Sequence, residues 1–517
     1  IKDAQSTKYT EGVRVKKTSA VLILLFLILS VGVRLSGAHG ATLSRPVVRA
    51  ATEIVAFSHD ILLSTDDSLY AHHVETTMAI GDKGQIFVGW KDAMSHNGGG
   101  YRVSMVVSHD GGESWSRPQY MPMFAGLETR QSDPWMVWHN GTLYYAYLEF
   151  TEDSGFTQIT VARSQDNGST WDTSTASFGQ YFADKETMAI SASGTIFVVY
   201  DDVDLSENGT TTVRLSQSTD GGATFGETAV IGEPDEGNVG PYIALNGSDA
   251  IFVAWTYLQQ EGGNLYLAQS TDGGLSFGEP QLINNDGNYS DFTVVGGRPS
   301  QLTLPVIRFD QWNRLYVLWA DRYDQKTGSF DVYLRYSDDF GATWSDRLRI
   351  NPNTEGNQWC PEMDIDSEGR IHIVYYDEEG DSYRPYYRVV QFTGENRTTA
   401  VLGTPIPVSE TSTSDDFTRP GDYFVIKLDS HGIPHVAWTD GRDGEMDIYY
   451  AHGLTEPSTT TETSSTTTTG VTITTTTGTN GASMLVETGI LIGAVVVTLA
   501  ILIVCLLYTS DAADEGL

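Results

Sequence analysis

The stretch SQDNGSTW, from Ser164 to Trp171, decides the fold, because the chain carries four more copies of it. Each copy has a Ser, an Asp two places later, then a Gly, a Ser or Thr, and an aromatic residue. Asp and Ser or Thr side chains hydrogen-bond to the backbone of a tight turn, and Gly supplies a positive φ. The pattern predicts five hairpin turns. The other copies are SHDGGESW (Ser108 to Trp115), STDGGATF (Ser218 to Phe225), STDGGLSF (Ser270 to Phe277) and SDDFGATW (Ser337 to Trp344).

These turns carry the Asp-box, or BNR, signature, and the chain resembles the sialidase-like β-propeller superfamily. In that family the box is a structural turn on the face away from the active site. The resemblance therefore implies a structural role for the aspartates of the boxes, and catalysis has to be sought elsewhere. These aspartates are Asp110, Asp166, Asp220, Asp272 and Asp339.

A second repeat alternates with the boxes and gives the number of blades. Its seven copies start 53 to 64 residues apart and alternate β-branched with aromatic residues. Such a period is typical of a four-stranded blade repeated around a channel. We expect an all-β propeller of seven blades, with the six blades of the recognised sialidases as the alternative. The copies are GQIFVGW (from Gly84), GTLYYAY (Gly141), GTIFVVY (Gly194), DAIFVAW (Asp249), NRLYVLW (Asn313), GRIHIVY (Gly369) and GIPHVAW (Gly432).

The last copy lacks an Asp box and an outer strand. The segment TEIVAFSHDILLS, Thr52 to Ser64, precedes the first complete repeat and can supply the missing strand. Such closure joins the two ends of the ring and leaves no exposed sheet edge.

The two ends of the chain predict secretion and membrane anchoring. A positive flank, an apolar run from Ala20 to Val33 and small residues up to Ala41 are typical of a signal peptide, with a membrane anchor as the alternative. The uncharged run from Gly489 to Tyr508 is long enough to cross a membrane once. We predict a single-pass cell-surface protein with an extracellular propeller. The predicted parts are 1–41 leader and signal peptide, 42–453 propeller, 454–484 Thr/Ser-rich stalk, 485–508 transmembrane helix and 509–517 tail.

Composition narrows the range of partners. The net charge of −36 disfavours nucleic acid as a ligand. The only cysteines are Cys360 and Cys505, and the latter lies in the apolar run, so no disulfide is expected in the ectodomain. The adjacent His72 and His73 point apart on a strand, and no motif indicates a metal ion or another cofactor. The sequence does not predict an oligomeric state.

Sequons for N-glycosylation occur at Asn140, Asn167, Asn208, Asn246, Asn288 and Asn396.

The resemblance also implies a catalytic set. Sialidases use a Tyr nucleophile assisted by Glu, an Asp as acid/base, and three arginines that bind the substrate carboxylate. Tyr423 lies nine places before Gly432, like the family's nucleophile, and Glu186 and Glu75 open inner strands from which they could assist it. A Tyr that merely lines the channel is the alternative. The arginines that enter inner strands are Arg130, Arg298 and Arg419.

Two features depart from the sialidase pattern. The family's Arg and Pro motif before the first blade is replaced around Glu75, and its acid Asp falls near Asn97, where Asp92 could substitute. Two functions therefore remain. One is a cell-surface sialidase-type glycosidase that binds and hydrolyses terminal acidic sugars of glycans or glycoproteins. The other is a noncatalytic propeller that binds glycans or proteins.

Overall fold

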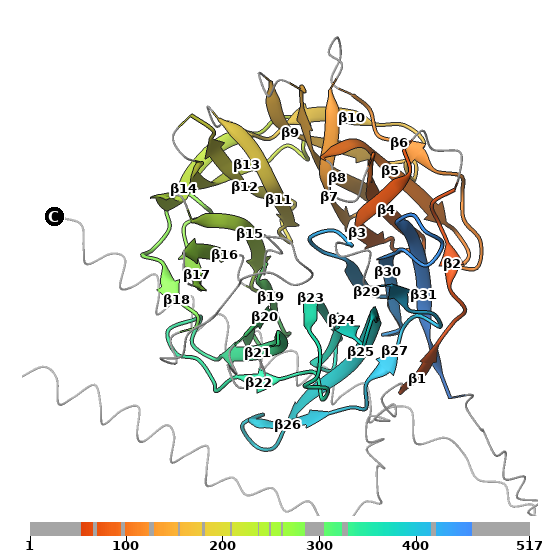
Figure 1. The fold of residues 1–517 in the computed structure, drawn as a ribbon. Helices are drawn as coiled ribbons and strands as arrows, with labels where there is room; N and C mark the ends of the chain where they lie inside the picture. The colour runs from red at the N-terminus through yellow and green to blue at the C-terminus, as the bar shows by residue number, and fades with distance from the viewer. Residues whose placement is uncertain are drawn as a thin grey trace, which may run out of the picture. The chain divides into compact units, whose positions relative to one another are not determined.

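The chain folds into a ring of seven antiparallel sheets, as the repeats predicted (Figure 1). The computed structural model describes residues 53–456, except 66–69, 95–98, 124–128, 153–155, 178–180, 207–208, 236, 248–249, 260–261, 285–303, 323–328 and 415–419. The predicted signal peptide, stalk and transmembrane helix lie outside these residues. In the part that is described, no helix is both long and apolar enough to span a membrane.

Each of the first four blades is a sheet of four strands in chain order, with its first strand at the centre of the ring. Their bounds follow. Blade 1 has β3 (His72–Ile80), β4 (Ile86–Ala93), β5 (Gly100–Ser108) and β6 (Gln119–Tyr120); blade 2 has β7 (Arg130–His139), β8 (Thr142–Phe150), β9 (Thr157–Ser164) and β10 (Asp172–Thr175). Blade 3 has β11 (Phe182–Ile190), β12 (Ile196–Asp204), β13 (Thr210–Ser218) and β14 (Gly226–Asp235); blade 4 has β15 (Asn238–Leu245), β16 (Ile251–Gln259), β17 (Gly262–Ser270) and β18 (Gln281–Leu282).

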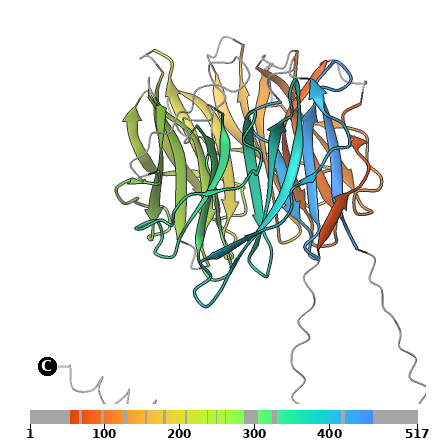
Figure 2. The ribbon, with the colours of Figure 1, turned by 60° about the horizontal axis from the view of Figure 1, so that its bottom comes forward.

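The last three blades complete the ring, and Figure 2 shows the blades standing side by side around it. Blade 5 has β19 (Val306–Phe309), β20 (Leu315–Asp321), β21 (Asp331–Ser337) and β22 (Leu348–Arg349). Blade 6 has β23 (Gln358–Ile365), β24 (Arg370–Glu378), β25 (Ser382–Thr393), β26 (Thr399–Leu402), β27 (Ile406–Pro407) and β28 (Thr413–Ser414). Blade 7 has β29 (Val425–Leu428), β30 (Pro434–Asp440), β31 (Asp447–Thr455), β1 (Ile54–Phe57) and β2 (Ile61–Leu62).

The second strand of each blade contributes a large aromatic side chain to the core. These are the residues that end the seven sequence repeats, and each is at most 2% exposed. Burying an aromatic ring of this size between neighbouring sheets is a major source of stability in a repeat fold. The residues are Trp90, Tyr147, Tyr200, Trp255, Trp319, Tyr375 and Trp438.

The five Asp boxes are the turns that follow the third strands of blades 1 to 5. In the second box, Asp166 Oδ1 accepts hydrogen bonds from Ser164 Oγ at 2.8 Å and from the Thr170 amide at 2.9 Å. Gly168 has φ 84° and donates its amide to Ser164 Oγ at 2.8 Å. The hydrogen bonds from Thr170 and Ser164 lower the pKa of Asp166 to about 2. These hydrogen bonds within the turn explain the structural role that was predicted for the Asp boxes.

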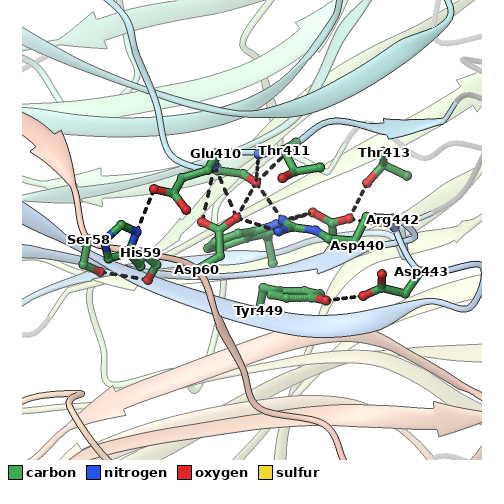
Figure 3. A network of polar contacts seen from close by, with 12 residues as sticks. Ser58, His59, Asp60, Glu410, Thr411, Thr413, Asp440, Arg442, Asp443 and Tyr449 are labelled. Atoms are coloured by element: carbon green, nitrogen blue, oxygen red, sulfur yellow. Dashed lines mark hydrogen bonds and ion pairs between the residues drawn. The ribbon is translucent and has the colours of Figure 1, made fainter.

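The N-terminal segment closes the ring, as the missing outer strand predicted. Strands β1 and β2 both pair with β31, so blade 7 is built from the two ends of the propeller. Between these two strands, Asp60 accepts hydrogen bonds from Arg442 Nη1 at 2.7 Å and from Ser409 Oγ at 2.9 Å (Figure 3). Arg442 also contacts Asp440 at 2.5 Å. This network fastens the N-terminal segment to blades 6 and 7.

The substitution Asp60→Asn is expected to destabilise the propeller by about 1.5–3 kcal/mol, the usual worth of a hydrogen bond to a charged group. Asp60 is 5% exposed in its side chain, so water does not replace its contact with Arg442. Urea unfolding measures the effect. Glu53→Gln, at an exposed position in the same segment, is the control; equal stability of the two variants would contradict the role of Asp60.

Candidate functional site

The inner strands of five blades share one irregularity at the same level of the channel. In each, a residue adopts a left-handed conformation and the pairing with the second strand is interrupted there. A bulge of this kind turns side chains away from their normal direction in the sheet. Polar side chains of several blades are thereby directed to one level of the channel. The left-handed residues are Glu75 (φ 61°), Asp133 (φ 52°), Lys185 (φ 54°), Gly240 (φ 65°) and Cys360 (φ 46°).

A pocket lies at this level on the axis of the ring. It spans about 760 Å³ when its open mouth is included, but only about 50 Å³ admits a water molecule. The enclosed part thus holds a few waters, and a sugar ring can enter only if side chains move. Aromatic and carboxyl side chains dominate the lining, with one lysine and, among the described residues, no arginine. These side chains are Trp135, Tyr242, Phe330, Trp359, Tyr423, Asp133, Glu186, Glu362, Asp422 and Lys185.

Lys185 forms a bridge across the channel. Its Nζ lies 3.1 Å from Asp133 Oδ1 of blade 2 and 2.6 Å from Asp422 Oδ2, which precedes blade 7. Burial alone would lower the pKa of Lys185, but Asp133 and Asp422 raise it well above its usual value. Burial likewise tends to raise the pKa of Asp133, but Lys185 and Lys91 outweigh it, and the pKa of Asp133 is lowered. An ionised carboxylate is therefore held at the pocket wall.

Glu186 follows Lys185 in β11, and its surroundings favour the protonated carboxyl group, in contrast to those of Asp133. Glu186 is 3% exposed, and neither carboxyl oxygen has a hydrogen-bond partner among the residues that the structure describes. Burial and the charge of Asp133 raise its pKa well above the usual value. The protonated form of Glu186 is thus favoured beside an Asp133 whose ionised form is favoured. Two carboxyl groups whose environments separate their pKa values are the arrangement that acid and base catalysis requires.

Further carboxyl groups surround this pair. Glu75 pairs with Lys91 at 2.6 Å, and Asp201 Oδ2 accepts the Gly240 amide at 2.8 Å. Burial and the charge of Asp133 raise the pKa of Asp184 to about 7. The site therefore carries more carboxyl groups than lysines, and protonation of some of them balances its charge.

Tyr423 lies in the pocket, as predicted, with its hydroxyl 3.4 Å from the Pro134 carbonyl that it donates to. Its ring meets Trp135 edge-on, with centroids 6.5 Å apart. Burial, followed by the charges of Asp133 and Glu75, raises the pKa of Tyr423 well above its usual value. The phenol is therefore hard to ionise here, which disfavours it as a nucleophile. The structure brings Tyr423 and Glu186 together in one lining.

Asp92 does not line this pocket. Its carboxylate accepts hydrogen bonds from Trp90 Nε1 at 2.7 Å and Ser104 Oγ at 2.7 Å, and contacts His73 Nδ1 at 2.6 Å. The same contact between Trp and Asp two residues apart recurs at Trp319 and Asp321 and at Trp438 and Asp440. Because the same Trp–Asp contact recurs in three blades, we assign Asp92 a structural role within its blade.

Of the three arginines predicted to bind a carboxylate, the structure describes only Arg130. Arg130 donates from Nε to the Gly100 carbonyl at 2.9 Å and from Nη2 to the Gly99 carbonyl at 3.0 Å. Its guanidinium also lies over the ring of Tyr101, 4.2 Å from the centroid. Arg130 thus belongs to the rim of blades 1 and 2. Arg298 and Arg419 lie outside the described residues, so their convergence stays a prediction.

Sequence reasoning missed Asp133, Lys185, Asp422 and Glu362 as site residues. A signal for two of them is present in aligned inner strands: SDPWM and DKETM place Asp133 and Lys185 three places before a Met, where WCPEM has Cys360. Within the described residues, no group of His, Cys, Asp and Glu is arranged to hold a metal ion.

Comparisons with known proteins agree with the repeat pattern. The model of the BNR repeat-like domain matches residues 7–294. A comparison with curated proteins gives no significant match. Similar solved structures include a protein of unknown function from Dyadobacter fermentans, at 16% identity, with 62% of this chain and 94% of that chain covered and a TM-score of 0.44.

Two further similar structures are glycosidases. An α-L-arabinanase from Penicillium chrysogenum in complex with arabinobiose is 15% identical, with 62% of this chain and 94% of that chain covered and a TM-score of 0.43. A sialidase from Trypanosoma rangeli in complex with sialic acid is 12% identical, with 65% and 57% covered and a TM-score of 0.43. Arabinobiose and sialic acid are ligands of those two proteins.

Proposed function

This chain belongs to the family defined by the BNR repeat-like domain, and on that premise we propose that its axial pocket binds the terminal sugar of a glycan and hydrolyses the glycosidic bond. One observation carries the proposal: among aromatic side chains the pocket holds two carboxyl groups in opposite surroundings, Glu186, which is buried, and Asp133, which is paired with Lys185. Aromatic rings that line a pocket offer apolar faces on which a sugar can stack.

The proposed chemistry follows from the two protonation states. Glu186 donates its proton to the departing glycosidic oxygen, so that the alcohol leaves uncharged. The carboxylate of Asp133 either attacks the anomeric carbon or removes a proton from an attacking water. Both roles are those of the two carboxyl groups of an ordinary glycosidase, and they make no use of a phenolate.

Tyr423→Phe tests the two-carboxyl mechanism against the Tyr nucleophile that the resemblance implies. We expect the variant to keep its turnover within about tenfold of the parent, because a positioned acid or base contributes about 10²–10⁴-fold and Tyr423 supplies neither here. Steady-state hydrolysis of a fluorogenic glycoside measures this. A complete collapse of turnover with the fold intact would instead identify Tyr423 as the nucleophile.

The function itself is tested with the purified chain and a panel of fluorogenic glycosides. Binding is followed in parallel by tryptophan fluorescence, since Trp135 and Trp359 line the pocket. Turnover supports the proposal. Binding without turnover would favour the noncatalytic propeller, and the absence of both would refute a glycan ligand at this site.

For location, we propose a cell-surface protein with the propeller outside, on the basis of the signal-peptide pattern and the apolar run 489–508. The sequons then differ in accessibility. Asn140 and Asn396 are exposed, whereas Asn246 is 7% exposed and accepts the Ala250 amide at 3.0 Å.

We therefore expect glycans on Asn140 and Asn396 and none on Asn246 when the chain is expressed in a secretory host. A glycan on Asn246 would have to displace a buried turn. Mass spectrometry of peptides after enzymatic deglycosylation reads the occupied sites. Unmodified Asn140 and Asn396 in a host that glycosylates a control protein would count against an extracellular propeller.

A further inference from the structure

The cations next to the pocket already have anionic partners. Lys185 is shared between Asp133 and Asp422, at 3.1 and 2.6 Å. Arg308 Nη2 lies 3.3 Å from Glu362 Oε1, and its guanidinium covers the ring of Tyr242 at 4.9 Å. These two side chains contact the lining from blades 3 and 5. Neither offers an unengaged cation to a ligand.

Three other cations that the structure describes near the channel are no better placed. Lys91 pairs with Glu75 at 2.6 Å, and Arg130 is held by backbone carbonyls. Lys427 is not among the lining residues, and burial together with Arg308 lowers its pKa. A ligand carboxylate in the pocket would therefore meet the ionised Asp133 and the carboxyl group of Asp422, and none of the described cations named above is free to compensate.

We propose that the axial pocket takes an uncharged terminal sugar and rejects a sugar that bears a carboxylate; this rests on the proposed function of the same site. Hydroxyl groups can hydrogen-bond to carboxylates and to a protonated Glu186, whereas a buried carboxylate without a cation is strongly disfavoured. The geometry thus points away from the acidic sugars that the family resemblance predicted.

Pairs of sugars that differ in one group provide the test. A glucoside and a glucuronide, and a galactoside and a galacturonide, differ only in a CH₂OH or a carboxylate at C6; an α-sialoside is added. Binding to the full chain is measured by tryptophan fluorescence and calorimetry at low salt. We expect at least one uncharged sugar to bind about tenfold or more tightly than its acidic counterpart, because like charges are placed together in the latter.

The outcomes separate this inference from the proposed function. An acidic sugar that binds as tightly as its uncharged counterpart, or more tightly, overturns the inference and leaves a glycan function standing. If none of the sugars binds, the inference and the proposed function both fall.

Glu362→Gln tests the physical reason. The substitution keeps the shape of the side chain but removes the charge that holds Arg308, so the guanidinium becomes available to a ligand carboxylate. We expect the affinity for acidic sugars to rise about tenfold relative to uncharged ones. Glu368→Gln makes the same change at an exposed position and should leave the ratio unaltered. An unaltered ratio in Glu362→Gln would overturn the argument, and if that variant does not fold, the sugar pairs decide.

Discussion

Glu186→Gln is expected to lower glycoside turnover by about 10²–10⁴-fold, the usual contribution of a positioned general acid. An amide has the shape of the protonated carboxyl but cannot give up a proton to the leaving oxygen. Because burial favours the uncharged form of Glu186, a neutral amide suits the same surroundings. Activity should therefore fall while binding of the sugar is kept.

The pH dependence of stability checks the protonation state independently of activity. The pKa of Glu186 is raised in the folded chain above its unfolded value of 4.5, so its contribution is fully present below that value and is lost as pH rises through the folded pKa. The Glu186→Gln variant has no carboxyl group at this position, so its free energy of unfolding does not decrease for this reason. Urea unfolding between pH 4 and 8 should show that the free energy of unfolding of the variant increases relative to that of the parent as pH rises. Parallel curves would mean that Glu186 is already ionised and cannot be the acid.

Local chemistry explains why the fold could be predicted from sequence. An Asp box is complete within eight residues, since Asp166 bonds Ser164 and Thr170 of the same turn. Each second strand carries a large aromatic residue at a regular spacing in the sequence, so counting these residues gives the number of blades. The closing strand could be predicted because blade 7 lacked one, and β1 fills that place.

The candidate site was only partly predictable, because its contacts join residues that are distant in sequence. Lys185 and Asp422 lie 237 positions apart, and they meet only because their blades share one channel. The bulges also decide which side chains reach the axis, and a simple alternation of inward and outward residues does not reveal them. Tyr423 and Glu186 were found by family resemblance and inner-strand position, whereas Asp92 shows that a carboxylate near a loop can serve the scaffold.

Lys185→Met is expected to destabilise the propeller at pH 7 by about 3–5 kcal/mol, the usual cost of removing one partner from a buried ion pair. The side chains of Lys185, Asp133 and Asp422 are 12%, 7% and 1% exposed, so water cannot replace the ammonium group. Two carboxylates from blade 2 and the entry to blade 7 would be left without their shared cation. Chemical unfolding of the variant and of Lys83→Met, at an exposed turn, measures the difference.

Acid should reduce this difference. In the parent, Lys185 and Lys91 hold the pKa of Asp133 below its unfolded value of 3.8, so the stability that Asp133 contributes is present above that pH and is lost as pH falls through the folded pKa. Without Lys185, burial raises the pKa of the same carboxyl, and the variant loses stability as pH rises. The gap between parent and variant should therefore widen from about pH 4 to pH 7. A gap that stays constant over this range, or a cost below about 1 kcal/mol at pH 7, would mean that Lys185 fills space in the channel without setting the charge of Asp133.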